Sequence, residues 1–171
     1  DQLLFRDPFR DLLAKECQPE QVRFAWVDAA GRLADVWSAL AEMGVLGVQV
    51  PEADGGLGLG ETDLVLLLEE TGRVGFPDPI VETAAVAAPL LADVAAAPST
   101  SPAAVELAHT WSGRIASGQA VVAVALEPGA PVSHGRDADL LLAADHGGDG
   151  HRWLAALAGD RIDAVDQPSV D

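Results

Sequence analysis

The sequence predicts an α+β protein in which an all-helical part comes first and a smaller β part follows. Apolar residues recur at helical spacing to about residue 117, whereas short apolar runs alternate with turn clusters after Gly118. Apolar residues make up 49% of the 171-residue chain, which is enough for a buried core. We therefore expect a helical domain over residues 1–117, with Trp26 and Trp37 in its core, and a partial antiparallel β-domain over residues 118–171.

The first three helices are predicted from apolar spacing and from the residues that interrupt it. The first covers the N-terminal residues to about Leu13, and Pro8 either begins it or kinks it. A second, short helix follows Pro19. A third helix runs over about residues 32–43, where one face is apolar and Gly44 supplies the C-cap.

The fourth helix is predicted to begin near Glu61, after the Gly-rich segment 45–60, because acidic residues favour the first turn of a helix. The run 64–68 is apolar all round, which indicates a helix that is buried on every side. Glu69 and Glu70 come next and, being adjacent, point to different faces. We expect them at a polar rim or a partner contact rather than as an acid–base pair.

Two more helices complete the helical part. Residues 80–97 are Ala-rich and predict a buried helix kinked at Pro89. Their longest uncharged run is far shorter than the roughly 20 residues that span a membrane, so no membrane span is expected. Ser101 and Pro102 are typical of an N-cap and a first helical residue, and they predict a sixth helix over about residues 103–115.

The β part is predicted from short apolar runs that are bounded by turn residues. Four strands are expected, over residues 121–126, 140–144, 153–158 and 161–165.

The charge of the chain excludes several classes of partner. The 27 acidic residues outnumber the 10 basic ones and give a net charge of −17. Lys15 is the only lysine and the arginines are scattered, which argues against nucleic acid and against an anionic membrane surface. The single cysteine, Cys17, excludes an internal disulfide and favours the cytoplasm. The chain starts at Asp1 without a basic n-region, so no signal peptide is expected.

Three groups of residues resemble fragments of functional motifs. The Gly-rich loop 55–60 lacks both phosphate-binding spacings and is interpreted as a tight connection. Metal-ligating side chains gather in a Gly-rich turn, for which a plain turn is the favoured interpretation. These side chains are Asp145, His146, Asp149 and His151. Ser133, His134 and Asp137 contain the residue types of a triad but lack a nucleophile elbow.

An ordered set of motifs extends over the helical part. Residues 37–52 read WSALAEMGVLGVQVPE, residues 55–63 read GGLGLGETD, and residues 66–73 read LLLEETGR. This order resembles the N-terminal domain of the flavin-dependent acyl-CoA dehydrogenases, where L-x-x-x-G-x-x-G leads to V-P-E-x-x-G-G-x-G and a helix ending E-E-x-G-R. The first residues, DQLLFR, the stretch from Pro77 to Leu91 and the segment WSGRIASG at 111–118 also resemble the family.

The resemblance implies a fold and a chemistry. Family members have a helical N-terminal domain, a central β-domain and a C-terminal four-helix bundle that builds dimers and tetramers; here the bundle is expected to be absent. They bind FAD, whose N5 accepts a β-hydride from an acyl-CoA while a carboxylate removes the α-proton, and an electron-transferring flavoprotein is the usual acceptor. The resemblance also implies a sharp turn before the buried helix, with positive φ at one or more of Gly55, Gly56 and Gly58.

The flavin-contacting turn of the family reads A-L-T-E-P-x-A-G-S-D. The corresponding residues proposed here as its remnant are Leu126, Glu127, Pro128 and Gly129. Leu126 replaces a hydroxyl residue, and Pro131 removes a backbone donor. These departures predict that the chain alone does not hold FAD, and no catalytic residue is assigned.

Two functional hypotheses follow from the resemblance. In the first, the chain is a subunit or N-terminal portion of a cytoplasmic, oligomeric acyl-CoA dehydrogenase of lipid or steroid side-chain catabolism. It would then be a non-catalytic or incomplete partner of an intact subunit or of a C-terminal half. In the second, it is a non-enzymatic helical binding module that has kept the dehydrogenase fold.

Overall fold

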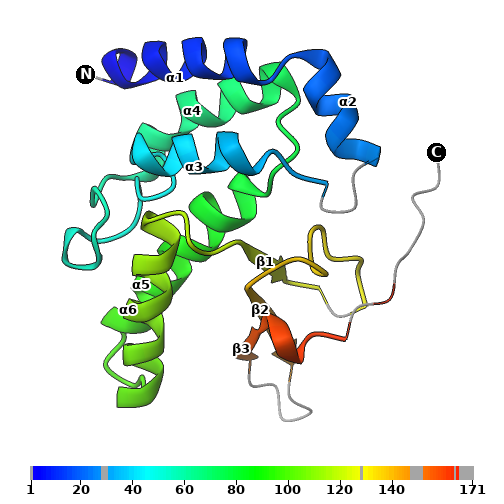
Figure 1. Cartoon of the computed structure of the whole chain (residues 1–171). Helices are drawn as coiled ribbons and strands as arrows, with labels where there is room; N and C mark the ends of the chain where they lie inside the picture. Colours follow the sequence, from blue (N-terminus) through cyan, green and yellow to red (C-terminus); the bar gives the residue numbers. More distant parts are fainter. Residues whose placement is uncertain (1, 28–30, 128, 147–151, 164, 166–171) are drawn as a thin grey trace.

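The computed structural model describes residues 2–27, 31–127, 129–146, 152–163 and 165 (Figure 1). The helices come first and the strands last, which confirms the predicted fold class. The helical elements are α1 (Gln2–Glu16), α2 (Pro19–Val27), α3 (Ala34–Glu42), η1 (Glu52–Asp54), α4 (Glu61–Val74), η2 (Val81–Ala87), α5 (Ala88–Ala96) and α6 (Pro102–Ala116). The strands β1 (Val122–Ala125), β2 (Leu140–His146) and β3 (Arg152–Ala158) follow, and then the short 3-10 turn η3 (Gly159–Arg161).

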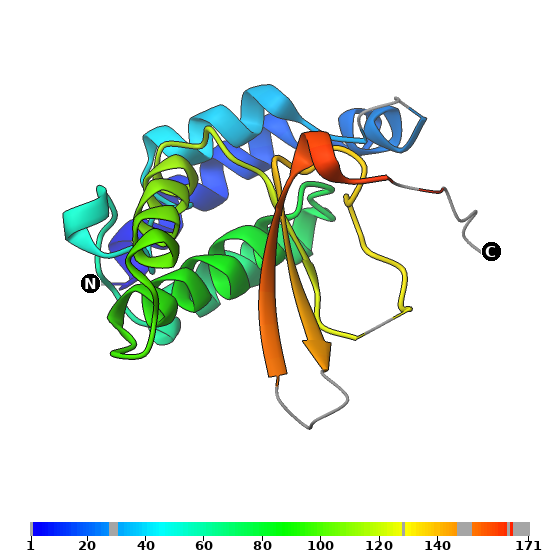
Figure 2. The ribbon, with the colours of Figure 1, turned by 90° about the horizontal axis from the view of Figure 1, so that it is seen from below.

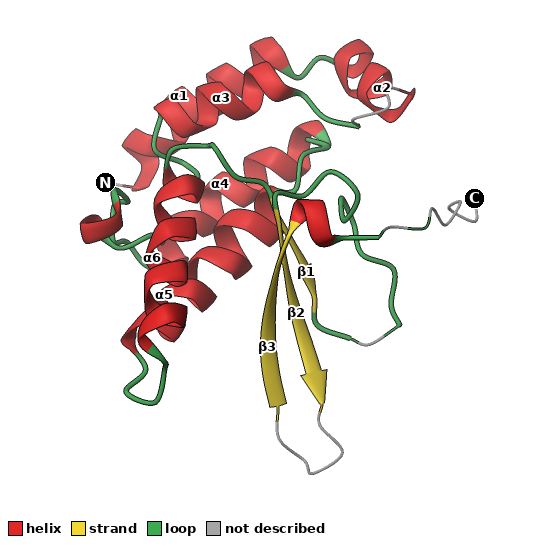
Figure 3. Cartoon of the chain, turned by 60° about the horizontal axis from the view of Figure 1, so that its bottom comes forward, coloured by secondary structure: helices red, strands yellow, loops and turns green. Residues whose placement is uncertain are grey.

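The helices gather on one side of the molecule and the sheet lies beside them (Figures 2 and 3). One core cluster lies among the helices and includes Phe9, Trp37 and Leu67. A second cluster joins helix to sheet, because Leu91 and Ile115 of the helices belong to it together with residues of β1 and β2. The start of the sheet is therefore part of the helical core, and the predicted domain boundary at residue 117 stays a prediction.

The sheet is mixed rather than wholly antiparallel, which corrects the expected pairing. β1 pairs parallel with β2, with Val122 opposite Leu140, and β2 pairs antiparallel with β3. The long connection over residues 126–139 returns the chain to the starting end of β1, so β1 and β2 run in the same direction. The predicted fourth strand is wrong over the residues of it that are described, because 161 belongs to η3 and residues 162, 163 and 165 are outside any strand.

Several local predictions are confirmed. Gly44 ends α3 with φ +77° in the position after the C-cap residue Met43, and Ser101 caps α6 by accepting a hydrogen bond from the backbone N–H of Ala104 at 3.3 Å. Gly55 and Gly58 have φ of +85° and +60°, as the sharp turn before α4 requires.

Three predictions about burial are wrong. Trp37 is buried as expected, but Trp26 is 73% exposed on α2. α4 is buried along one face only, because Leu64 and Leu67 are in the core whereas Val65 is 52% exposed. Glu70 is buried rather than at a polar rim. An all-apolar run shows that a helix has apolar side chains on every face. Which of these faces are buried depends on the elements that pack against the helix.

The kinked helix predicted over residues 80–97 consists of a π-helix followed by an α-helix. Its first part, η2, is a π-helix, and α5 continues from Ala88 with Pro89 in its first turn. Proline lacks an N–H and crowds the carbonyl four residues earlier, and a wider turn relieves that crowding. Pro8, in contrast, lies within α1 rather than at its start. In the described part of the chain, each helix is too short or too polar to cross a bilayer.

Candidate functional site

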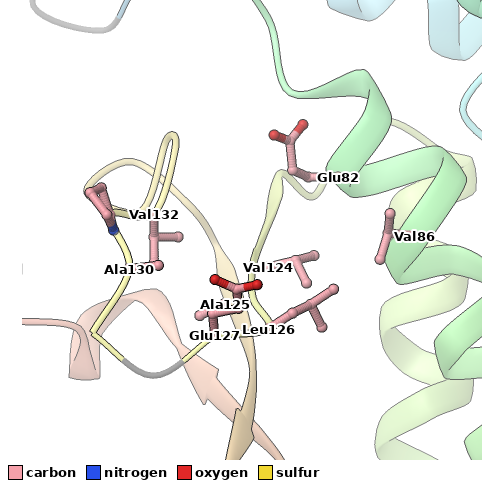
Figure 4. A pocket seen from close by; sticks show the side chains of 9 residues that line it. Glu82, Val86, Val124, Ala125, Leu126, Glu127, Ala130 and Val132 are labelled. Carbon is pink, nitrogen blue, oxygen red and sulfur yellow. The ribbon is translucent and has the colours of Figure 1, made fainter. Parts of the chain in front are cut away.

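A hollow of about 300 Å³ lies between η2 and the end of β1 (Figure 4). Glu82 and Val86 form the η2 side, and the residues that follow β1 form the other side. The complete lining is Glu82, Val86, Val124, Ala125, Leu126, Glu127, Ala130, Pro131 and Val132. Most of these side chains are aliphatic, so the hollow suits an apolar ligand group. We call it the η2–β1 hollow.

Thr83 fixes the distance between the two walls of the hollow. Its fully buried hydroxyl accepts a hydrogen bond from the backbone N–H of Val122 at 3.1 Å and donates one to the Val122 carbonyl at 3.2 Å. The π-helical turn and the edge of β1 are thereby joined at one residue. Glu82 and Val86 belong to the same turn as Thr83, and the lining residues 124–127 follow Val122 directly.

Loss of the Thr83 hydroxyl is expected to loosen this joint. Thr83→Val keeps the side-chain shape but leaves the N–H and C=O of Val122 without their partner, so unfolding should become easier by about 1–2 kcal/mol. Thr83→Ser keeps the hydroxyl and serves as the control. Thermal unfolding followed by circular dichroism measures both variants. Equal melting temperatures for wild type and Thr83→Val would contradict this role.

The residues that lead into β1 are held by polar contacts. The carboxylate of Asp139 accepts a hydrogen bond from the backbone N–H of Val121 at 2.8 Å, and the Asp139 N–H donates to the Val121 carbonyl at 2.9 Å. The indole N–H of Trp37 donates to the carbonyl of Gly118 at 3.2 Å. The entry of the chain into β1 is therefore fixed from α3 and from the residue that precedes β2.

The predicted remnant of the flavin-contacting turn lies partly at this hollow. Leu126 and Glu127 line it, Gly129 follows with φ +80°, and Pro128 is outside the described residues. The structure brings Leu126 and Glu127 together with Glu82 and Val86, which the sequence did not single out. Whether this turn binds a cofactor stays a prediction.

The described residues of the turn do not by themselves fit a dinucleotide. The N–H of Ala130 donates to the Glu127 carbonyl at 3.2 Å and is used within the turn, and Pro131 has no N–H. The ionisable side chains in the lining are the carboxylates of Glu82 and Glu127, which would repel a diphosphate. Aliphatic side chains fit the apolar part of a ligand, so the hollow offers one wall of a site.

Two buried carboxylates outside the hollow have structural roles. Glu70 on α4 accepts hydrogen bonds from Arg10 of α1, with Nε at 2.8 Å, and from Arg73, with Nε at 2.7 Å. The Arg10 guanidinium above all lowers the pKa of Glu70 to about 2. Asp78 accepts from the N–H of Leu33 at 2.7 Å and pairs with Arg32 at 3.1 Å, while burial raises its pKa. Glu69 is exposed, as the predicted separation of the two glutamates requires.

The other candidate groups do not form sites in the described residues. The Gly-rich loop uses its N–H groups internally, for example Gly56 to the Pro51 carbonyl at 3.1 Å and Gly58 to that of Val50 at 2.9 Å. A cluster suited to a metal is absent from the residues that the structure describes, and the predicted members Asp149 and His151 lie outside them. Among the described side chains, a hydrogen bond joining Ser133, His134 and Asp137 is absent.

Comparison with known proteins gives the class of protein. The model of the acyl-CoA dehydrogenase N-terminal domain matches residues 1–97, which is more than half of the chain. The chain belongs to the acyl-CoA dehydrogenase family.

Two curated proteins that are similar to this chain in sequence are also described as acyl-CoA dehydrogenases. The chain is 31% identical over 145 residues to acyl-CoA dehydrogenase IpdE2 of Mycobacterium tuberculosis, an alignment that covers 84% of this chain and 42% of the relative. It is 33% identical over 81 residues to IpdE2 of Mycolicibacterium smegmatis, covering 47% and 26%. The chain therefore spans less than half the length of the curated relatives it matches.

Solved structures share the fold. The ChsE4-ChsE5 complex from Mycobacterium tuberculosis matches with a TM-score of 0.73 and 23% identity, over 92% of this chain and 46% of that one. The Tcur3481-Tcur3483 steroid ACAD variant matches with a TM-score of 0.72 and 24% identity, over 93% and 48%. At this identity the likeness establishes the arrangement of helices and strands.

Proposed function

We propose that this chain is a subunit, or the N-terminal portion of one, of an FAD-dependent acyl-CoA dehydrogenase of lipid or steroid side-chain catabolism. The family match over residues 1–97 carries the proposal. The aliphatic η2–β1 hollow supports it, because an acyl chain needs an apolar wall. The steroid ACAD among the structural relatives supports the substrate class.

The residues of this chain would bind and orient the acyl group. FAD, when bound in the assembled enzyme, supplies the acceptor for the hydride. Val86, Val124 and Leu126 would exclude water from the acyl chain, and Thr83 would hold the two walls at a fixed separation. We assign no catalytic base to this chain, because neither carboxylate of the lining is oriented by a side-chain hydrogen bond to another described residue.

We further propose that the chain works in the cytoplasm as a non-catalytic partner of an intact dehydrogenase subunit. The departures at Leu126 and Pro131 support this, since they remove a hydroxyl and a backbone donor from the turn. The relatives described as the ChsE4-ChsE5 complex and Tcur3481-Tcur3483 each pair two named chains. The single cysteine favours a reducing compartment.

Flavin content tests the proposal. The protein is purified from its host with all chains that accompany it, and its absorbance spectrum and released FAD are measured. We expect flavin bands that bleach when an acyl-CoA is added. A colourless preparation that binds no FAD would contradict the proposal of a dehydrogenase assembly and favour the second hypothesis, a helical binding module. The turn after β1, which has few backbone donors, also favours that hypothesis.

A further inference from the structure

The η2–β1 hollow carries negative charge at an otherwise aliphatic wall. Glu82 is half-buried on the first turn of η2, and Glu127 lies across the hollow after β1 (Figure 4). The nine lining residues include no lysine, arginine or histidine. A ligand group that enters this hollow therefore meets two carboxylates without a compensating cation.

The backbone next to Glu82 is held against β1. The next residue, Thr83, is tied to Val122 by its two hydrogen bonds, and the Thr83 N–H donates to the Pro79 carbonyl at 3.0 Å. These contacts keep the backbone of Glu82 beside the hollow, and its carboxylate is part of the lining.

We infer that these carboxylates make the hollow selective for an uncharged acyl group that carries a hydroxyl, and that Glu82 determines this selectivity. The inference rests on the proposed function. An ionised carboxylate accepts hydrogen bonds but donates none, so its complement in a ligand is an O–H group. A carboxylate at the end of the acyl group would be repelled, because it would carry the same charge as the two glutamates of the lining.

The inference is tested with three CoA thioesters of equal chain length that end in a methyl, a hydroxyl or a carboxylate. Their dissociation constants are measured calorimetrically on the purified protein with all accompanying chains. The wild type is expected to bind the hydroxyl-ended thioester most tightly and the carboxylate-ended one about 10- to 100-fold more weakly than that.

Two variants at one position separate repulsion from hydrogen bonding. Glu82→Gln removes the charge and adds a donor, so the carboxylate-ended thioester should bind about tenfold more tightly while the hydroxyl-ended one changes little. Glu82→Leu should lose the preference for the hydroxyl. Glu69→Gln on the exposed face of α4 is the matched control and should leave all three constants unchanged. Glu127→Gln repeats the charge test on the other wall.

The outcomes distinguish this inference from the proposed function. Equal affinities for the three thioesters in a flavin-containing wild type would overturn the inference alone. The inference alone would also be overturned if Glu82→Gln left the affinity for the carboxylate-ended thioester at its wild-type value. If no thioester binds and no flavin is present, both this inference and the proposal that the chain belongs to a dehydrogenase assembly are overturned.

Discussion

Replacing Gly56 by alanine is expected to reduce the free energy of unfolding by about 3 kcal/mol or more. A Cβ atom at this position would lie 2.1 Å from the backbone oxygen of Val50 and 2.4 Å from its Cβ. The same oxygen accepts the N–H of Gly58, so moving it away would also disturb the loop that leads into α4. Because the clash involves backbone rather than a flexible side chain, the loop has no easy way to relax.

Gly72→Ala is the matched control for this experiment. Gly72 lies within α4, and a Cβ there would have no heavy atom within 4 Å. Alanine is favoured over glycine in a helix, so this variant should be as stable as wild type or up to about 1 kcal/mol more stable. Chemical denaturation followed by circular dichroism compares the two. A Gly56→Ala protein with wild-type stability would contradict the close approach described here.

Replacing Glu70 by glutamine is expected to reduce the free energy of unfolding at pH 7 by about 2–3 kcal/mol. The buried carboxylate accepts charge-assisted hydrogen bonds from Arg10 and Arg73, and it joins α1 to α4. Glutamine fills the same space but carries no charge to pair with either guanidinium. The two arginines are about half exposed, so they can turn to water, which keeps the loss moderate.

The effect of Glu70→Gln should depend on pH. The folded pKa is about 2 and the ordinary value is 4.5, so ionised Glu70 contributes its stabilisation fully above about pH 4.5 and loses it as the pH falls toward 2. The difference in unfolding free energy between wild type and variant should therefore shrink between those pH values. Glu69→Gln, an exposed neighbour, should show little difference at any pH. A difference for Glu70→Gln that does not change with pH would contradict the ion pair.

The helices were predictable because their limits have local causes. Ser101 with Pro102 at the start of α6 and Gly44 after α3 fix helix ends through their own backbone and side-chain preferences. The pairing of β1 with β2 was not predictable in this way, because a short apolar run such as 121–126 has the same pattern in parallel and antiparallel sheets. The direction is set by the long connection between the strands.

The candidate site was predictable in part. Leu126 and Glu127 were found through the family resemblance of their turn. Glu82 and Val86 were missed because they are 40 or more residues away from Leu126 and Glu127 in sequence and reach the hollow only through the π-helical turn, which has no residue signature of its own. Trp26 shows the opposite error: an aromatic residue predicts burial only when another element covers it.

The wide turn of η2 restricts how this segment of the protein can diverge in evolution. Substitutions at its exposed positions leave the backbone intact, but deletion of one residue between Val81 and Ala87 would convert it toward an α-helix and rotate the preceding residues by about 100°. Thr83 would then face away from β1. Among sequences that keep this hollow, we expect gaps to fall before Pro79 or in the connection 97–101 and not within η2.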